Sequence, residues 1–376
     1  VEGLRALAAY VVYVNHAYAM SWAPFQKQYP SSGLSWLSYF LVWGHLSVTF
    51  FIVISGFCLT LPVVRSGGLL RAGTKAFLKR RARRILPPYY GAVVLCLVLI
   101  ATVIGKPTGT LWDVPIGVNW VAFISHMVLL QDLFGTSKIN YVFWSIAVEW
   151  QIYFLFPLIV WSWRRFGPRV TVTGALVLGY ALRFGFADTR VVRAAPQYIG
   201  CFALGVLAAY VARSSEGGYV RLRARIPWGL LALGALGCVG VMSRVWGFAV
   251  ATERFHLLDL PTAIAAMCLL VSTSKPEGPM PPIGRCLAWR PLAWIGTFSY
   301  SVYLVHAPLL QILWQYVLHP AGLGCGATFI ALMGPGAVAV LVVSYGFFKI
   351  CEEPFMRPAG ARVARESEGA PELGGA

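Results

Sequence analysis

Long apolar runs dominate this sequence, and short polar joints rich in arginine separate them. A helix needs about 20 residues to cross the roughly 30 Å of hydrocarbon in a bilayer. The runs do not show the strict alternation of a membrane β-barrel strand, and a helix satisfies its backbone within its own segment. The pattern predicts an all-α polytopic bundle of about ten transmembrane helices, over residues 5–23, 38–63, 85–104, 141–163, 170–187, 196–212, 227–246, 257–273, 292–318 and 323–348.

The segment 116–134 is apolar enough to cross the membrane, but it contains a histidine, a glutamine and an aspartate. Cytoplasmic loops of membrane proteins are enriched in Lys and Arg. If this segment stays at the surface or re-enters, 23 of the 31 Lys and Arg residues lie on the side of the N-terminus. If it spans, the division becomes 15 to 16. The first arrangement is predicted, with both termini cytoplasmic.

Composition agrees with a membrane protein, because 58% of residues are hydrophobic and only 12% are charged. The formal net charge of +17 raises nucleic acid as a partner. Cationic loops beside anionic lipid headgroups explain this charge better, so a lipid bilayer is the expected partner and nucleic acid is not. The eight cysteines form no CxxC pair, no histidines have HExxH spacing, and no metal site is predicted.

The first predicted helix carries Arg5 and His16, which are eleven residues apart. Eleven steps of 100° place both side chains within about 20° on one helix face and about 16 Å apart along the axis. Arg5 lies at the cytoplasmic edge, whereas His16 lies deep in the span. An ionisable residue inside a span is a functional candidate, although a hydrogen-bonded structural histidine is the alternative.

Residues 79–89 contain four arginines within five positions, followed by two prolines. The prolines are typical of the first turn of a helix, so Arg81 and Arg84 are expected just before a helix start. Guanidinium groups bind phosphate with paired hydrogen bonds, and a helix start adds amide donors. Anchoring of the topology alone is the competing interpretation.

Glu149 is the only acidic residue placed well inside a predicted span, and it shares a helix face with Ser145 and Tyr153. A carboxylate there must face the bundle interior, be protonated or pair with a cation. Ser299, Tyr303 and His306 share a face of the span 292–318, and Pro308 frees a backbone carbonyl near His306. A structural ion pair for Glu149 and a structural role for His306 remain the alternatives.

Taken together, these stretches resemble the acyltransferase-3 family of membrane O-acyltransferases. The matching pieces occur in family order over nearly the whole chain: GLRALAA through His16, FFIVISGF, RRARRILPPYY, LLQDLF, WSIAVEWQIYFLFP, FSYSVYLVHAPLL and the final Glu352-Glu353-Pro354. One visible departure is Thr49, where many members carry an acidic or amide residue. This departure bears on the choice of acceptor more than on catalysis.

The resemblance implies transfer of an acyl group, usually acetyl, from cytoplasmic acyl-CoA to a hydroxyl, commonly on a carbohydrate. Arg5, Arg81 and Arg84 are then expected to hold the acyl-CoA phosphates. His16 is expected to act as general base or acyl carrier, with Glu149 orienting its imidazole. The acceptor is expected to contact the residues Tyr153, Ser299, Tyr303 and His306. No permanently bound cofactor is expected.

Several alternatives remain open. A stand-alone member could acylate a small natural product such as a macrolide, and a polysaccharide or lipid transporter could share the same helices. Residues 1–358 are predicted to form one transmembrane domain without an added extracytoplasmic domain, and residues 359–376 a disordered cytoplasmic tail. The expected location is a bacterial cytoplasmic membrane.

Overall fold

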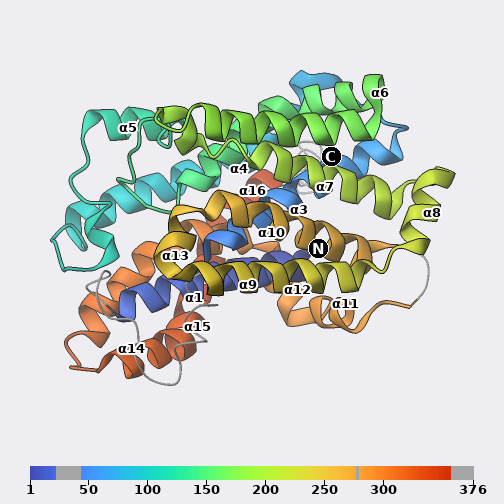
Figure 1. Cartoon of the computed structure of the whole chain (residues 1–376). Helices are drawn as coiled ribbons and strands as arrows, with labels where there is room; N and C mark the ends of the chain where they lie inside the picture. The colour runs from blue at the N-terminus through green and yellow to red at the C-terminus, as the bar shows by residue number, and fades with distance from the viewer. Residues whose placement is uncertain (23–43, 277–278, 357–376) are drawn as a thin grey trace, which may run out of the picture.

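The computed structural model describes residues 1–22, 44–276 and 279–356, which contain helices and no strands (Figure 1). The α-helices are α1 (Glu2–Ser21), α3 (Gly44–Arg65), α4 (Gly73–Thr102), α5 (Trp120–Met127), α6 (Trp144–Gly185), α7 (Tyr198–Arg213), α8 (Gly217–Arg225), α9 (Trp228–Glu253), α10 (Phe255–Ser274), α11 (Pro282–Leu287), α12 (Arg290–Thr297), α13 (Ser299–Leu313), α14 (Cys325–Ala331), α15 (Ala337–Phe347) and α16 (Glu353–Met356). Short 3-10 turns are η1 (Leu111–Asp113) and η2 (Arg190–Ala194), and π turns are η3 (Trp314–Leu318), η4 (Leu332–Gly336) and η5 (Phe348–Glu352).

Within the described residues, eight helices are long and apolar enough to cross a membrane. The 20-residue α1 adds another long helix to the bundle. The 42-residue α6 bends at Gly167, where φ is 81°, and its two arms coincide with the predicted spans 141–163 and 170–187. The prediction of an all-helical, multi-pass membrane protein is therefore confirmed, whereas the number of spans and the side of the termini stay predictions.

The ambiguous segment 116–134 contains only the eight-residue helix α5, which is about 12 Å long and too short to cross a bilayer. Tyr89 donates to the backbone carbonyl of His126 at 3.1 Å, and Gln131 donates to the carbonyl of Phe143 at 2.9 Å. These contacts hold the segment against α4 and α6. The prediction that it does not span as a helix is confirmed.

The arginine-rich stretch 79–89 lies inside a helix and not before one. Helix α4 begins at Gly73, so Pro87 and Pro88 lie in its interior. Proline is tolerated inside membrane helices where neighbouring groups satisfy the freed backbone. The carbonyls freed by Pro87 and Pro88 are those of Arg83 and Arg84, and the Tyr300 hydroxyl donates to the adjacent carbonyl of Ile85 at 3.2 Å. The expectation that a helix start adds amide donors beside Arg81 and Arg84 is therefore wrong.

The predicted span 292–318 is two helices, because the chain breaks at Phe298 between α12 and α13. The hydroxyl of Ser299 donates to the carbonyl of Gly296 at 2.9 Å and so satisfies a group freed by the break. The last helical stretch runs from 325 to 356 and extends past the predicted end at 348. Residues 38–43 and the predicted tail 359–376 lie outside the described residues.

Helix α1 lies at the centre of the bundle, in contact with α3, α12 and α13. Small residues permit close helix approach in membranes. A Cβ on Gly296 would lie 2.1 Å from the carbonyl oxygen of Glu2, and one on Gly205 of α7 would lie 2.1 Å from that of Val53 in α3. These approaches hold α12 against α1 and α7 against α3, beside the cavity that forms the candidate site.

Candidate functional site

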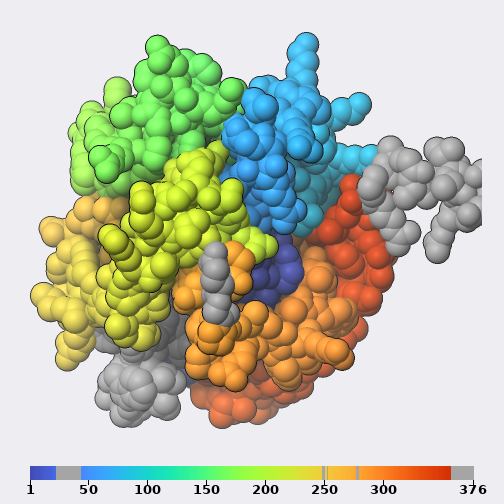
Figure 2. All heavy atoms as spheres, turned by 90° about the vertical axis from the view of Figure 1, so that its right-hand side faces the viewer, coloured from blue at the N-terminus to red at the C-terminus, as the bar shows by residue number. Residues whose placement is uncertain are grey.

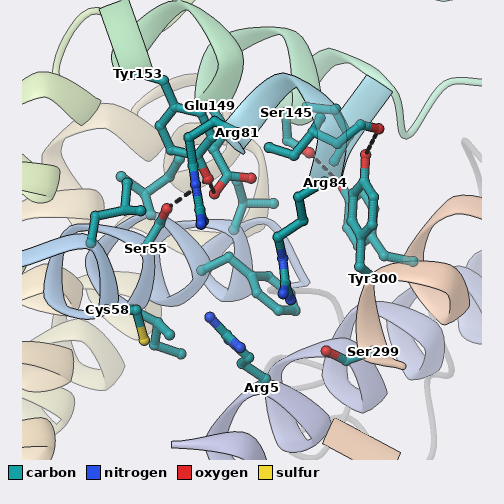
Figure 3. A pocket seen from close by; sticks show the side chains of 18 of the residues that line it. Arg5, Ser55, Cys58, Arg81, Arg84, Ser145, Glu149, Tyr153, Ser299 and Tyr300 are labelled. Carbon is teal, nitrogen blue, oxygen red and sulfur yellow. Dashed lines mark hydrogen bonds between the residues drawn. The ribbon is translucent and has the colours of Figure 1, made fainter. Parts of the chain in front are cut away.

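A cavity of about 110 Å³ lies between α1, α3, α4, α6 and α13 (Figure 3). It brings together residues that are distant in sequence. Among the predicted site residues, those that line it are Arg5, Arg81, Arg84, Glu149, Tyr153, Ser299 and Tyr303. The predicted residues His16 and His306 lie beyond its inner end, where they contact each other.

Three arginines from two helices point into the same space, Arg5 from α1 and Arg81 and Arg84 from α4 (Figure 3). Arg5 also pairs with Glu2, with a distance of 3.1 Å between Nη1 and Oε1. The Nε of Arg81 is buried and has no hydrogen-bond partner in the described structure. Converging guanidinium groups with unused donors form a suitable site for a phosphate or another multivalent anion.

The start of α1, which carries Arg5, is visible at the centre of one end of the molecule (Figure 2). Atoms from α8, α11 and the beginning of α4 surround it in this view. The basic stretch of α4 lies at the same end, since Arg81 and Arg84 share the cavity with Arg5. The arginine cluster is therefore close to the end of the bundle that the charge distribution assigns to the cytoplasm.

Glu149 is held by its own helix. The hydroxyl of Tyr153, one turn further along α6, donates to Oε1 of Glu149 at 2.5 Å. Ser55 of α3 lies 2.9 Å from the same hydroxyl and is in turn its donor. The described residues show no hydrogen bond between Glu149 and the His16 imidazole, so an orienting role of Glu149 stays a prediction. Glu149 of α6 and Arg5 of α1 both line the cavity, whereas His16 lies beyond its inner end.

The inner end of the cavity is closed by a pair of hydroxyls. Ser145 of α6 and Tyr303 of α13 are 2.6 Å apart, and the Tyr303 hydroxyl also lies 3.1 Å from the carbonyl of Val142. The ring of Phe51 packs edge-on against Tyr303, with 5.9 Å between centroids. The Tyr303 ring lies 5.8 Å from that of His306, so one side chain separates the cavity from the histidines.

His16 and His306 form a stacked and hydrogen-bonded pair, with 2.8 Å between Nδ1 of His16 and Nε2 of His306. Nδ1 of His306 lies 2.8 Å from the carbonyl oxygen of Tyr303, which can only accept, so this nitrogen carries a proton. In the neutral ring, Nε2 of His306 is then an acceptor and Nδ1–H of His16 is the donor. The arrangement leaves a lone pair on Nε2 of His16.

Tyr141 lies beside this pair. Its ring packs edge-on against His16 with 5.1 Å between centroids, and its buried hydroxyl has no hydrogen-bond partner in the described part of the chain. The freed carbonyl expected from Pro308 is that of Leu304, and Asn140 donates to it at 3.2 Å. The loop 128–143 thus braces α13 next to the histidines and also brings a free hydroxyl to them.

Sequence reasoning missed two buried carboxylates. Glu352 of η5 lines the cavity with 1% of its surface exposed, and Asp259 of α10 is fully buried. Both fell close to predicted span boundaries, where an acidic residue suggests an exposed helix end. Glu149 is therefore not the only acidic residue in the interior of the bundle.

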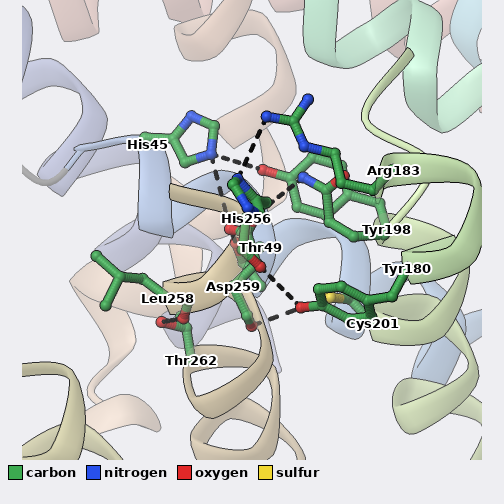
Figure 4. A network of polar contacts seen from close by, with 11 residues as sticks. His45, Thr49, Tyr180, Arg183, Tyr198, Cys201, His256, Leu258, Asp259 and Thr262 are labelled. Atoms are coloured by element: carbon green, nitrogen blue, oxygen red, sulfur yellow. Dashed lines mark hydrogen bonds and ion pairs between the residues drawn. The ribbon is translucent and has the colours of Figure 1, made fainter. Parts of the chain in front are cut away.

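Asp259 is the centre of a second polar network, between α3, α7 and α10 (Figure 4). Its carboxylate accepts from Thr49 at 2.6 Å and from Gln197 at 3.0 Å, and it lies 3.6 Å from Nε2 of His45. The Tyr198 hydroxyl is 3.1 Å from the same nitrogen. Thr49, the departure noted in the sequence, therefore donates to a carboxylate that a different helix supplies.

A family model described as the acyltransferase domain matches residues 1–349, which is nearly the whole chain. The chain is similar to YrhL of Bacillus subtilis (strain 168), with 27% identity over 294 residues, 72% of this chain and 44% of that protein. It is also similar to the O-acetyltransferase OatA of Staphylococcus aureus (strain NCTC 8325 / PS 47), with 25% identity over 335 residues, 84% of this chain and 51% of that protein.

The peptidoglycan O-acetyltransferase OatA of Listeria monocytogenes (serovar 1/2a, strain ATCC BAA-679 / EGD-e) is 25% identical over 332 residues, 83% of this chain and 49% of that protein. The chain thus spans about half the length of these relatives. No solved structure matches it. The match over residues 1–349 confirms the resemblance found in the sequence, and the chain belongs to the acyltransferase-3 family of multi-pass membrane proteins.

Proposed function

We propose that the chain is a membrane-bound O-acyltransferase that moves an acyl group, usually acetyl, from cytoplasmic acyl-CoA to a hydroxyl of a carbohydrate or glycosylated acceptor. One observation carries the proposal: a single cavity has three converging arginines toward one end and a histidine pair just beyond the other. The relatives named as O-acetyltransferases support the same reaction class.

The arginines would hold the phosphates of the donor. Arg5, Arg81 and Arg84 offer several N–H groups at the end of the bundle where a cytoplasmic nucleotide enters. The acyl-bearing arm of the donor would then extend along α1 toward His16, about 16 Å away along the helix axis. Binding energy at the phosphates would thus position a thioester at a remote reacting centre.

At the inner end, Nε2 of His16 would act as general base. It takes the proton of the acceptor hydroxyl while that oxygen attacks the thioester carbonyl carbon. The C–S bond then breaks, and the CoA sulfur leaves and recovers the proton from His16. His306 keeps the Nδ1–H of His16 directed at itself and so keeps the lone pair of Nε2 available. The Tyr141 hydroxyl, beside His16 and without a partner among the described residues, would donate to the developing oxyanion.

The proposal is tested with purified protein in nanodiscs and acetyl-CoA labelled in its acetyl group. The label should pass to an alkali-labile ester on an acceptor from a panel of peptidoglycan fragments and glycosylated macrolides. Label found on the wild-type protein before acceptor is added, and lost in His16→Ala, would identify His16 as a covalent carrier. Absence of both acetyl-CoA binding and transfer with every acceptor would overturn the proposal and favour a transporter.

A further inference from the structure

Within the described residues, two buried polar atoms without hydrogen-bond partners belong to side chains that line the same cavity. One is a donor, Nε–H of Arg81, and the other is an acceptor, Oε1 of Glu352. The second oxygen of Glu352 accepts from the Ser301 hydroxyl at 2.6 Å, which fixes the carboxylate at the cavity wall. Glu352 is 1% exposed, so bulk water does not compensate the unpaired oxygen.

An unpaired buried carboxylate oxygen is costly, because the group has lost water without gaining a donor. Native proteins keep few such atoms, and each one calls for an explanation. Here the missing donor and the missing acceptor occur on one cavity. A ligand that satisfies both atoms must carry an anionic group that accepts from Arg81. Close to this group it must also carry a neutral N–H or O–H group that donates to Glu352.

An inorganic phosphate or diphosphate meets only half of this requirement, since its oxygens accept from Arg81 but repel the carboxylate. A nucleotide also carries ribose O–H and adenine N–H donors, so the test below separates these donors from those of the pantetheine arm. Acyl-CoA meets both halves. Directly beyond its diphosphate, the pantetheine arm carries a hydroxyl and then amide N–H groups, all of which are hydrogen-bond donors. The electrostatic neighbours of Glu352 include Arg84 and Arg5, so the carboxylate is at the arginine end where this part of the donor would lie.

We infer that Glu352 binds the first hydroxyl or amide donor of the pantetheine arm, and so distinguishes acyl-CoA from other phosphate-bearing nucleotides. The inference rests on the proposed function, because it assumes that acyl-CoA occupies this cavity. Glu352 is thereby a specificity-determining residue for the donor and has no part in proton transfer at His16.

The test compares two ligands, acetyl-CoA and 3′-phospho-ADP, which is the nucleotide half of CoA without the arm. Glu352→Ala should weaken acetyl-CoA binding about tenfold or more relative to 3′-phospho-ADP, since a hydrogen bond to a charged group is lost. Glu352→Gln, which keeps the shape and one acceptor oxygen, should give a smaller change in this ratio. Isothermal titration on the full chain in nanodiscs measures both affinities.

The matched control is Glu353→Ala. Glu353 carries the same charge one residue away, but it pairs with Lys349 at 3.0 Å on the outside of the helix. This variant should leave the affinity ratio unchanged. If Glu352→Ala and Glu352→Gln change the affinities for acetyl-CoA and 3′-phospho-ADP by the same factor, the inference is refuted. Glu352 would then act only through its charge beside the phosphates. Wild-type protein that binds 3′-phospho-ADP but not acetyl-CoA would refute the proposed function itself.

Discussion

Replacement of His306 tests whether the histidine pair fixes the tautomer of His16, with the proton on Nδ1 and the lone pair on Nε2. In His306→Ala, Nδ1–H of His16 loses its acceptor, so the proton is no longer directed to that nitrogen. One neutral hydrogen bond contributes about 1–1.5 kcal/mol, which corresponds to about 5- to 13-fold in the population of the active tautomer. Loss of ring orientation adds to this effect; at metal sites, the partners that orient a ligating histidine contribute about 10- to 100-fold, and we take the same range here. We expect kcat to fall by about 10- to 100-fold.

The assay measures transfer from labelled acetyl-CoA at saturating donor, together with the acetyl-CoA Kd. The Kd should change little, because His306 lies beyond the inner end of the cavity while the arginines hold the phosphates. His306→Gln can still accept from His16 and should lose less activity. His126→Gln is the control, since His126 is equally buried and bonded to the backbone but makes no hydrogen bond or ring contact with His16 among the described residues. Full kcat in a folded His306→Ala protein would refute the assignment of the tautomer.

Three further changes test other parts of the site. Arg84→Ala should weaken acetyl-CoA binding by about 1.5–3 kcal/mol, measured by titration, whereas replacement of the exposed neighbour in Arg83→Ala should not. Equal affinities of the two variants would mean that the arginine cluster only anchors the topology. Tyr141→Phe should lower kcat at unchanged Kd if its hydroxyl stabilises the oxyanion, and unaltered kcat would exclude that role. Asp259→Ala should lower the melting temperature more than Asp259→Asn, because two buried donors lose their acceptor; equal melting temperatures would contradict a structural role for the network.

The transmembrane helices were predictable because hydropathy and charge asymmetry depend only on local sequence. The breaks within helices were not. Tandem prolines normally begin a helix, but α4 continues through Pro87 and Pro88, and Tyr300 of another helix packs beside them and donates to the carbonyl of Ile85. The break at Phe298 likewise depends on how α12 packs against α1, which no local pattern encodes.

Most of the predicted site residues line one cavity, whereas their pairing could not be predicted. Helical periodicity correctly placed Tyr153 beside Glu149, because both belong to one helix. It could not show that His16 meets His306, since that contact depends on the packing of α1 against α13. Glu352 was missed because the predicted span ended before it, and its burial follows only from the extension of the last helix.

The most direct test of the account measures acetyl-CoA binding and acetyl transfer on one purified His16→Ala protein. His16 is separated from the arginines by about 16 Å along α1, so removing its imidazole should spare the phosphate contacts. The account predicts an acetyl-CoA Kd within a few-fold of wild type and transfer reduced at least about 100-fold, the lower contribution of a general base. Transfer at the wild-type rate in the His16→Ala protein would contradict it.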